Sequence, residues 1–311
     1  FIVDPLDALK PYKDSSVAMM RAAQAAGYSV SAIQQPAIHW STQQGVCAEA
    51  TSLVMLDSDT EWYVEGETRT LALRDFDAVI MRKDPPFDTE FIYATYMLER
   101  AEDEGCLIVN KPQSLRAANE TLSTAWFAEH TPTTLVTRRA TKLRAFHAEH
   151  GDIILKPLDG MGGMGIFRVK ADGLNLGSII ETLNLDGAQT LMVQRYLPEI
   201  VEGDKRVLVI GGVPVPFTLA RIPQGSEVRG NLAAGGKGVA MPITEREREI
   251  AEALGPTLAA RGLLLVGRDV IGGCLTEVNV TSPTCFQEIT QQMGFDVAAM
   301  FVDALEAELA A

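Results

Sequence analysis

Short apolar strands alternate with helical patterns over the first 110 residues, and this alternation limits the possible folds more than any other feature of the chain. A chain that repeats strand, helix and strand forms a mainly parallel sheet with helices on its faces. The expected elements are strand 1–3, a helix from Asp14 or Ser15 to Gly27, strand 28–33, strand 78–82, helix 89–104 ended by Gly105, and strand 107–110. Residues 37–75 lack helical periodicity, and we interpret them as short strands.

The chain has 311 residues, about twice the usual size of a single domain, so we expect two or three units around a shared cleft. We predict an N-terminal α/β domain at 1–118, a small α+β domain at 119–196 and a C-terminal domain at 197–311. In the second unit we expect helices at 119–129 and 142–149, an extended 132–136, strands 152–156, 166–170 and 190–194, and a helix ending at 185. In the third we expect strands 207–210, 263–266 and 275–280 and a closing helix 296–309.

The chain is acidic, with 27 Lys and Arg against 41 Asp and Glu and a formal net charge of −14. This balance opposes nonspecific binding to nucleic acid or to an anionic membrane, so an anion site must be a local cluster of cations. The longest nearly apolar stretch, 207–220, is shorter than the roughly 20 residues that a membrane helix needs. Because the start has no basic flank and no apolar leader, and the four cysteines form no CxxC pair, we expect a cytoplasmic protein with free thiols.

Asp269, Glu277 and Asn279 form the strongest chemical pattern. Side chains alternate along a strand, so Glu277 and Asn279 share one face. Carboxylate and amide oxygens are ligands that magnesium prefers in proteins. A hairpin brings Asp269 to the same face only if its turn has three residues, 272–274, or if it contains an equivalent bulge, and we predict one of the two. The alternative is a hairpin whose charges face only water.

A second pattern is a strand that ends in Lys156 and continues into a loop rich in glycine, 157–165. Glycines let the backbone approach a phosphate chain closely and point several N–H groups at its oxygens, and Lys156 adds a positive charge. The segment is not the GxxxxGK[ST] motif and no helix start follows it, which disfavours a P-loop fold. The alternative is a glycine-rich hairpin without a ligand.

Residues 222–238 combine five glycines with Arg229 and Lys237. We predict a mobile lid, since a loop that closes over a reaction site excludes water from a sensitive intermediate. The alternative is an ordinary surface loop.

Five segments spread over nearly the whole chain carry a resemblance to a known family. They read IMRKDPPFDTEFIYATY at 80–96, VNKPQSLR at 109–116, ILKPLDGMGG at 154–163, RGNLAAGG at 229–236 and TEVNVTSPT at 276–284. These segments are similar to those of the prokaryotic glutathione synthetase family. Long and distributed motifs of this kind are more specific than any single glycine pattern.

The resemblance implies an ATP-grasp architecture with an N-terminal mainly parallel α/β domain, a small central lid domain and a C-terminal antiparallel-sheet domain. ATP would lie between the central and C-terminal domains. The implied ATP-binding residues are Lys156, Gly160, Gly162, Gly163, Gln194, Tyr196, Leu197 and Asp204, and the implied metal ligands are Asp269, Glu277 and Asn279. Arg206, Arg221, Arg229 and Asn231 would be catalytic, Ser282, Pro283 and Thr284 would take the substrate carboxylate, and Lys13, Asp14, Ser15 and Arg82 would hold the γ-glutamyl end.

The reaction that the resemblance implies is the ATP-dependent ligation of γ-glutamylcysteine to glycine through an acyl phosphate, with release of ADP and phosphate. Two Mg²⁺ ions per ATP are implied, with Mn²⁺ as a substitute, and the family suggests a homotetramer. Neither nucleic acid nor membrane is an expected partner. The alternatives are another ATP-grasp carboxylate–amine ligase, such as a D-alanine or glutamate ligase, and a catalytically silent nucleotide-binding module.

One departure concerns the segment Asn119-Glu120-Thr121-Leu122, where the family usually has lysine at the third position. A positive charge expected near the phosphates is therefore absent. We predict weaker ATP binding unless Lys111, Arg116 or Arg138 compensates.

Overall fold

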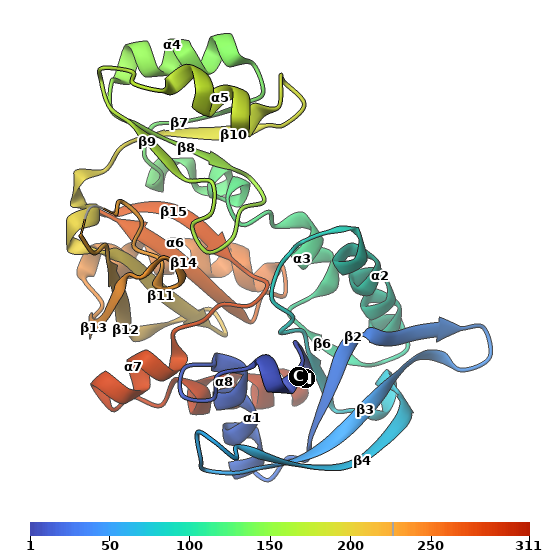
Figure 1. Ribbon diagram of the computed structural model, residues 1–311. Coiled ribbons are helices and arrows are strands. Elements are labelled where there is room, and N and C mark those ends of the chain that lie inside the picture. Colours follow the sequence, from blue (N-terminus) through green and yellow to red (C-terminus); the bar gives the residue numbers. More distant parts are fainter. Residues whose placement is uncertain (226) are drawn as a thin grey trace.

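The computed structural model describes residues 1–225 and 227–311, which form three regions in space (Figure 1). Ser226, inside the predicted lid, lies outside the described residues. None of the helices in these two ranges has the length and hydrophobicity that crossing a lipid bilayer requires.

The N-terminal region contains a mixed sheet. Strand β1 (Ile2–Val3) pairs in parallel with β2 (Val30–Ser41) and is bridged in parallel to Met81, directly after β5 (Ala78–Ile80), which pairs in parallel with β6 (Leu107–Val109). Beyond β2 the sheet turns antiparallel through β3 (Gly45–Met55) and β4 (Tyr63–Ala72). The prediction of short strands at 37–75 was therefore wrong in length. The register shifts between Ile33 and Ile38 and between Thr51 and Leu53 interrupt the alternation of apolar and polar residues by which a long strand is recognised in a sequence.

The expected N-terminal helices are present. Helix α1 (Ser15–Ala25) begins at Asp14, whose carboxylate accepts the backbone N–H groups of Ser16 and Val17 as an N-cap should. Helix α2 (Thr89–Asp103) is followed by the short α3 (Pro112–Ala117). Single 3₁₀ turns lie at Leu6–Ala8 and Leu73–Asp75.

The central region is a four-stranded antiparallel sheet with two helices on one side, drawn at the top of Figure 1. The strand order is β7-β10-β8-β9, and the connection between β8 and β9 extends from this sheet toward the C-terminal one. The helix expected at 119–129 is instead a 3₁₀ segment, Leu122–His130, interrupted at Phe127. The elements are β7 (Thr134–Thr137), α4 (Ala140–His150), β8 (Ile153–Pro157), β9 (Phe167–Val169), α5 (Leu176–Asn184) and β10 (Leu191–Arg195).

The C-terminal region is built on a five-stranded antiparallel sheet of order β13-β12-β11-β14-β15. Two of its helices, α6 and α7, were not predicted, and the strand expected at 263–266 begins at Leu265 and continues to Ile271. The elements are the 3₁₀ turns Pro198–Glu202 and Leu232–Ala234, β11 (Asp204–Ile210), β12 (Val213–Ile222), β13 (Lys237–Pro242), α6 (Glu245–Ala260), β14 (Leu265–Ile271), β15 (Cys274–Asn279), α7 (Phe286–Met293) and α8 (Val297–Leu309).

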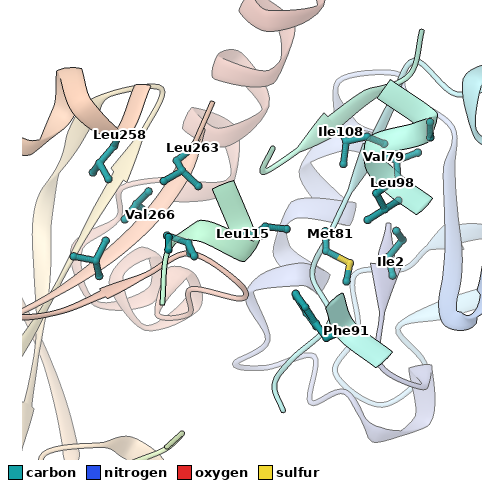
Figure 2. Packing of buried hydrophobic residues seen from close by; sticks show 14 of the residues in the cluster. Ile2, Val79, Met81, Phe91, Leu98, Ile108, Leu115, Leu258, Leu263 and Val266 are labelled. Carbon is teal, nitrogen blue, oxygen red and sulfur yellow. The ribbon is translucent and has the colours of Figure 1, made fainter. Parts of the chain in front are cut away.

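The N-terminal and C-terminal regions share hydrophobic cores, and Phe127 of the 3₁₀ segment Leu122–His130 belongs to one of them, whereas the sheet and helices of the central region have a core of their own. In Figure 2, Leu115 of α3 lies between Leu258, Leu263 and Val266 of the C-terminal region and the N-terminal residues around Met81. A second shared cluster joins α1 to α8. The buried residues of the third cluster all lie between Leu143 and Val193, and Leu135 and Ala140 pack against them. The predicted domain boundaries at 118/119 and 196/197 stay a proposal. Helix α8, at the end of the C-terminal region, packs against α1 of the N-terminal region.

Candidate active site

Residues from all three regions line a cavity of about 240 Å³. A smaller cavity of about 80 Å³ adjoins it, since Lys156, Ile166, Asn231 and Glu277 line both. The two cavities lie between the central sheet and the C-terminal sheet, where the loop from β8 to β9 reaches down in Figure 1.

Lys156 projects from β8 across this gap toward the C-terminal sheet. Its Nζ donates to the backbone carbonyl of Thr276 at 3.1 Å and lies 3.5 Å from Oε1 of Glu277. The lysine of the middle segment and the acidic strand near the end of the chain therefore meet at one site, as the sequence predicted. Burial raises the pKa of Glu277, and the charge of Lys156 acts in the opposite direction.

The hairpin of β14 and β15 places Asp269 directly opposite Glu277. Gly272 and Gly273 form a two-residue turn with positive φ at both positions, because Ile271 pairs with Cys274. A register shift after Asp269 supplies the extra residue. The predicted geometry is thus achieved by the bulge and not by a three-residue turn.

Asp269 is enclosed by two arginines from the neighbouring strands. Arg206 Nε and Nη2 bind its two carboxylate oxygens at 2.5 and 3.1 Å, and Arg221 Nη2 lies 2.8 Å from Oδ2. Its exposed fraction is 1%. Burial alone would raise the pKa of Asp269, but the two guanidinium groups outweigh burial and hold the pKa below its ordinary value. Asp269 therefore acts here as the anchor of Arg206 and Arg221, both of which line the cavity.

The glycine loop and the predicted lid touch each other above the cavity. Gly163 has a φ of +84°, and a Cβ atom there would lie 2.6 Å from Oδ1 of Asn231. The Gly163 carbonyl accepts a hydrogen bond from Arg229 Nη1 at 3.2 Å. The Arg229 guanidinium also pairs with Glu227, and this hydrogen bond, with two from backbone N–H groups, lowers the pKa of Glu227 to about 2. Gly160, Gly162 and Gly163 all line the larger cavity, and phosphate binding by this loop stays a prediction.

The smaller cavity contains the residues that the resemblance assigned to the nucleotide base and ribose: Gln194, Tyr196, Leu197 and Asp204. Arg168 stacks 3.5 Å from the centre of the Tyr196 ring and binds Asp152 through two hydrogen bonds, which fixes the ring. Burial raises the pKa of Asp204 to about 7 despite its pairing with Arg221. Its Oδ1 has no hydrogen-bond partner among the described residues.

The predicted substrate residues separate into two groups. Ser282 and Thr284 line the larger cavity. The remaining five do not line it among the described residues, and most have structural contacts instead. Asp14 caps α1, the Ser15 hydroxyl accepts the N–H of Phe286, and Arg82 is buried and donates to Ser16 and to the carbonyl of Pro283. The residues outside the cavity lining are Pro283, Lys13, Asp14, Ser15 and Arg82.

Thr121 lines the cavity at the place where the family usually has lysine. None of the three predicted substitutes, Lys111, Arg116 and Arg138, is among the residues that line either cavity in the described part of the chain. Arg116 pairs with Glu99 and stacks on Tyr96.

The sequence reasoning did not single out three other residues that line the larger cavity: Asp84, Glu120 and Cys285. Asp84 lies within the 80–96 segment and Glu120 lies beside Thr121, so the resemblance pointed to both stretches. Cys285 directly follows the predicted Ser282–Thr284 group.

The donor set suits a divalent cation that prefers oxygen ligands. Glu277 supplies a carboxylate and Asn279 an amide to the lining of the cavity. The buried amide nitrogen of Asn279 has no hydrogen-bond partner within residues 1–225 and 227–311. No cluster of three or more His, Cys, Asp or Glu side chains in these residues has the spacing of a complete metal site. The arrangement fits magnesium, which is held by one or two protein groups together with substrate phosphates.

The fold agrees with solved ATP-grasp structures. The D-cycloserine synthetase DcsG superposes with a TM-score of 0.70 at 17% identity, covering 99% of this chain and 98% of that one. A RimK domain protein ATP-grasp from Sphaerobacter thermophilus superposes with a TM-score of 0.61 at 17% identity, covering 97% and 98%. At these identities the similarity concerns the fold alone.

Sequence comparison is more specific. Residues 1–116 match the profile of the prokaryotic glutathione synthetase N-terminal domain, and residues 120–294 match that of the prokaryotic glutathione synthetase ATP-grasp domain. The chain is 59% identical over 308 residues to the glutathione synthetase of Ralstonia nicotianae, covering 98% of this chain and 94% of that protein. It is 54% identical to the glutathione synthetase of Shewanella oneidensis, covering 99% and 98%. With both profiles and full-length relatives in agreement, the chain belongs to the prokaryotic glutathione synthetase family.

Proposed function

We propose that this protein ligates γ-glutamylcysteine to glycine at the expense of ATP, using the two adjoining cavities as one active site. The observation that carries the proposal is the approach of Lys156 to Glu277 across the boundary between the central and C-terminal regions. A phosphate chain placed there meets a cation, a glycine loop and two oxygen donors at once. The full-length similarity to proteins named glutathione synthetase favours γ-glutamylcysteine and glycine as the substrates over the substrates of other ATP-grasp ligases.

The nucleotide would occupy the smaller cavity with its base beside Tyr196 and Leu197, and its phosphates would extend past Lys156 under the glycine loop. The cysteinyl carboxylate would attack the γ-phosphate to give an acyl phosphate and ADP. Arg206 and Arg221, fixed by Asp269, offset the charge that develops on the phosphoryl oxygens. The glycine amine would then displace phosphate, while the contact of Arg229 with Gly163 keeps water out.

Glu277 and Asn279 would hold magnesium, which supplies charge neutralisation at the phosphates. Oδ1 of Asp269 accepts a single hydrogen bond, from Arg206 Nε, so this oxygen would keep a lone pair for the metal while Oδ2 is held by both arginines. We also propose a homotetramer located in the cytoplasm. The family resemblance supports this assembly, and the mass of the purified protein measured by light scattering tests it.

The decisive experiment measures phosphate release with ATP, MgCl₂, γ-glutamylcysteine and each of several amino acids. We expect release that requires both γ-glutamylcysteine and glycine, and its loss when EDTA removes the metal. Replacement of MgCl₂ by MnCl₂ tests the identity of the metal. Release supported by D-alanine or glutamate without γ-glutamylcysteine would contradict the proposal, as would ATP binding without turnover.

A further inference from the structure

Three carboxylates line the larger cavity among the described residues: Asp84, Glu120 and Glu277. Two of them already have a partner. Glu277 faces Lys156 at 3.5 Å. Oε1 of Glu120 accepts hydrogen bonds from the N–H groups of Val280 and Thr281 and from the Thr281 hydroxyl, at 2.9, 3.0 and 2.9 Å. Glu120 therefore supports the loop after β15.

Asp84 is the least engaged of the three. Within residues 1–225 and 227–311 it forms no ion pair and its carboxylate accepts one hydrogen bond, whereas Glu277 faces Lys156 and Glu120 accepts three hydrogen bonds. The position of Asp84 is nevertheless well fixed. It follows β5 at the N-terminal side of the cavity, and its backbone N–H donates to Oδ2 of Asp4 at 3.0 Å. Lys83 Nζ binds Oδ1 of Asp4 at 2.8 Å and the Asp84 carbonyl at 2.6 Å. The Ser282 hydroxyl donates to Oδ1 of Asp84. One oxygen of this carboxylate therefore remains for a ligand.

One group of the proposed substrates, an ammonium group, requires an anionic acceptor, and among the described lining residues Asp84 is the carboxylate with the fewest contacts. Lys156, Arg206 and Arg221 suit phosphates and carboxylates. The γ-glutamyl end of γ-glutamylcysteine also carries an α-ammonium group, which requires an acceptor, preferably an anionic one. Resting on the proposed function, we propose that Asp84 binds the α-ammonium group of the γ-glutamyl residue and so makes the enzyme select for that group.

The chemistry favours this ammonium group over that of glycine. A carboxylate beside an amine stabilises the protonated form, which cannot act as a nucleophile. Glycine must attack as the free amine, so a fixed carboxylate bound to it would oppose the reaction. The γ-glutamyl ammonium takes no part in bond formation, and holding it protonated costs the reaction nothing.

The test compares Asp84→Asn with the wild-type enzyme on two acyl substrates, γ-glutamylcysteine and glutarylcysteine, which lacks only the ammonium group. Asparagine keeps the shape and can still accept the Ser282 hydrogen bond. For γ-glutamylcysteine we expect kcat/KM to fall about tenfold to hundredfold through a higher KM, the range expected for loss of a charge-assisted hydrogen bond. For glutarylcysteine, wild type and variant should be equal. Glu90→Gln, an exposed acid in the first turn of α2 and outside the cavity lining, is the matched control.

Each other outcome counts against the proposal. An equal loss with both acyl substrates would assign Asp84 a structural role, and a higher KM for glycine alone would assign it to the second substrate. If the variant does not fold, the wild type still decides: equal kcat/KM for γ-glutamylcysteine and glutarylcysteine would overturn ammonium recognition. A wild-type enzyme inactive with γ-glutamylcysteine and glycine would instead refute the proposed function itself.

Discussion

Lys156 and Glu277 lie close together in the site, with the lysine side chain almost fully buried and the carboxylate only partly exposed. Removing one member of such a pair leaves the other without compensation, in addition to removing its contact with a ligand. The lysine therefore favours the charged form of Glu277, and in the proposed function it also binds phosphate.

We expect Lys156→Met to weaken ATP binding about tenfold or more, because a charge-assisted contact in a partly buried site contributes roughly 1.5–3 kcal/mol. Isothermal titration with a nonhydrolysable ATP analogue and magnesium measures the effect. Lys170→Met, at an exposed position beyond β9, is the control. Equal affinity in the two variants would show that Lys156 does not reach the phosphates.

Thr121 offers a gain-of-charge experiment. It is buried and lines the larger cavity, whereas none of the three predicted substitutes, Lys111, Arg116 and Arg138, is among the described residues that line it. We expect Thr121→Lys to tighten ATP binding by about tenfold, close to one charge-assisted hydrogen bond. Thr121→Met adds similar length without charge and should leave the affinity unchanged. A nucleotide affinity that is the same in Thr121→Lys and wild type would contradict the prediction.

Residue patterns within one segment were predictable, and pairings between distant segments were not. Strand alternation places Glu277 and Asn279 on one face, and the sequence predicted that an odd-numbered turn or a bulge would bring Asp269 to the same face, as the register shift after Asp269 does. The enclosure of Asp269 by Arg206 and Arg221 depends on the pairing of β11 with β14 and β12. No local periodicity encodes that pairing. The sequence therefore identified these three residues without indicating that they neutralise one another.

At the level of elements, two loops from different regions meet over the cavity, the glycine loop after β8 and the segment before β13. Their contact depends on the absence of a side chain at Gly163, where a Cβ would collide with Asn231. The segment before β13 therefore fits against the glycine loop because position 163 carries no side chain.

Gly163→Ala should lower kcat/KM for ATP about tenfold beyond any effect on stability, because the added methyl group displaces Asn231. Gly27→Ala is a matched control, since Gly27 also has a positive φ, +95°, but no described atom lies within 4 Å of its Cβ position. Both variants pay a similar backbone cost of about 1–2 kcal/mol. Steady-state kinetics and thermal melts of the two variants separate these effects, and equal kinetics would contradict the steric argument.

Helices α6 and α7 and the length of strands β2 to β4 were not predicted from the sequence, for different reasons. Helix α6 begins with a capping box in which Thr244 and Glu247 each bind the backbone of the other, a signature visible in the sequence. Helix α7 begins after Cys285 in a left-handed conformation without a side-chain cap, and no local signal announces it. The length of β2 to β4 was hidden by register shifts that change which residues face the core.

At the level of the whole molecule, α3 joins the N-terminal and C-terminal regions through a shared core (Figure 2). We expect Leu115→Ala to lower the free energy of unfolding by about 2–5 kcal/mol, as for other large-to-small changes in a core. Leu309→Ala, on an exposed leucine near the chain end, should change it by less than about 1 kcal/mol. Denaturant titration measures both, and a small effect at Leu115 would show that the junction is not tightly packed.

The separate core of the central region, between Leu143 and Val193, allows that region to lose its structure while the other two remain joined. The central region supplies part of the lining of both cavities, so warming should abolish ATP binding at a temperature at which most of the chain keeps its secondary structure. Fluorescent-nucleotide binding and circular dichroism, followed on one temperature ramp, would then give two separate midpoints. On heating, the protein should therefore lose its ATP site before the rest of the chain unfolds. Saturating ATP should protect the protein from heat.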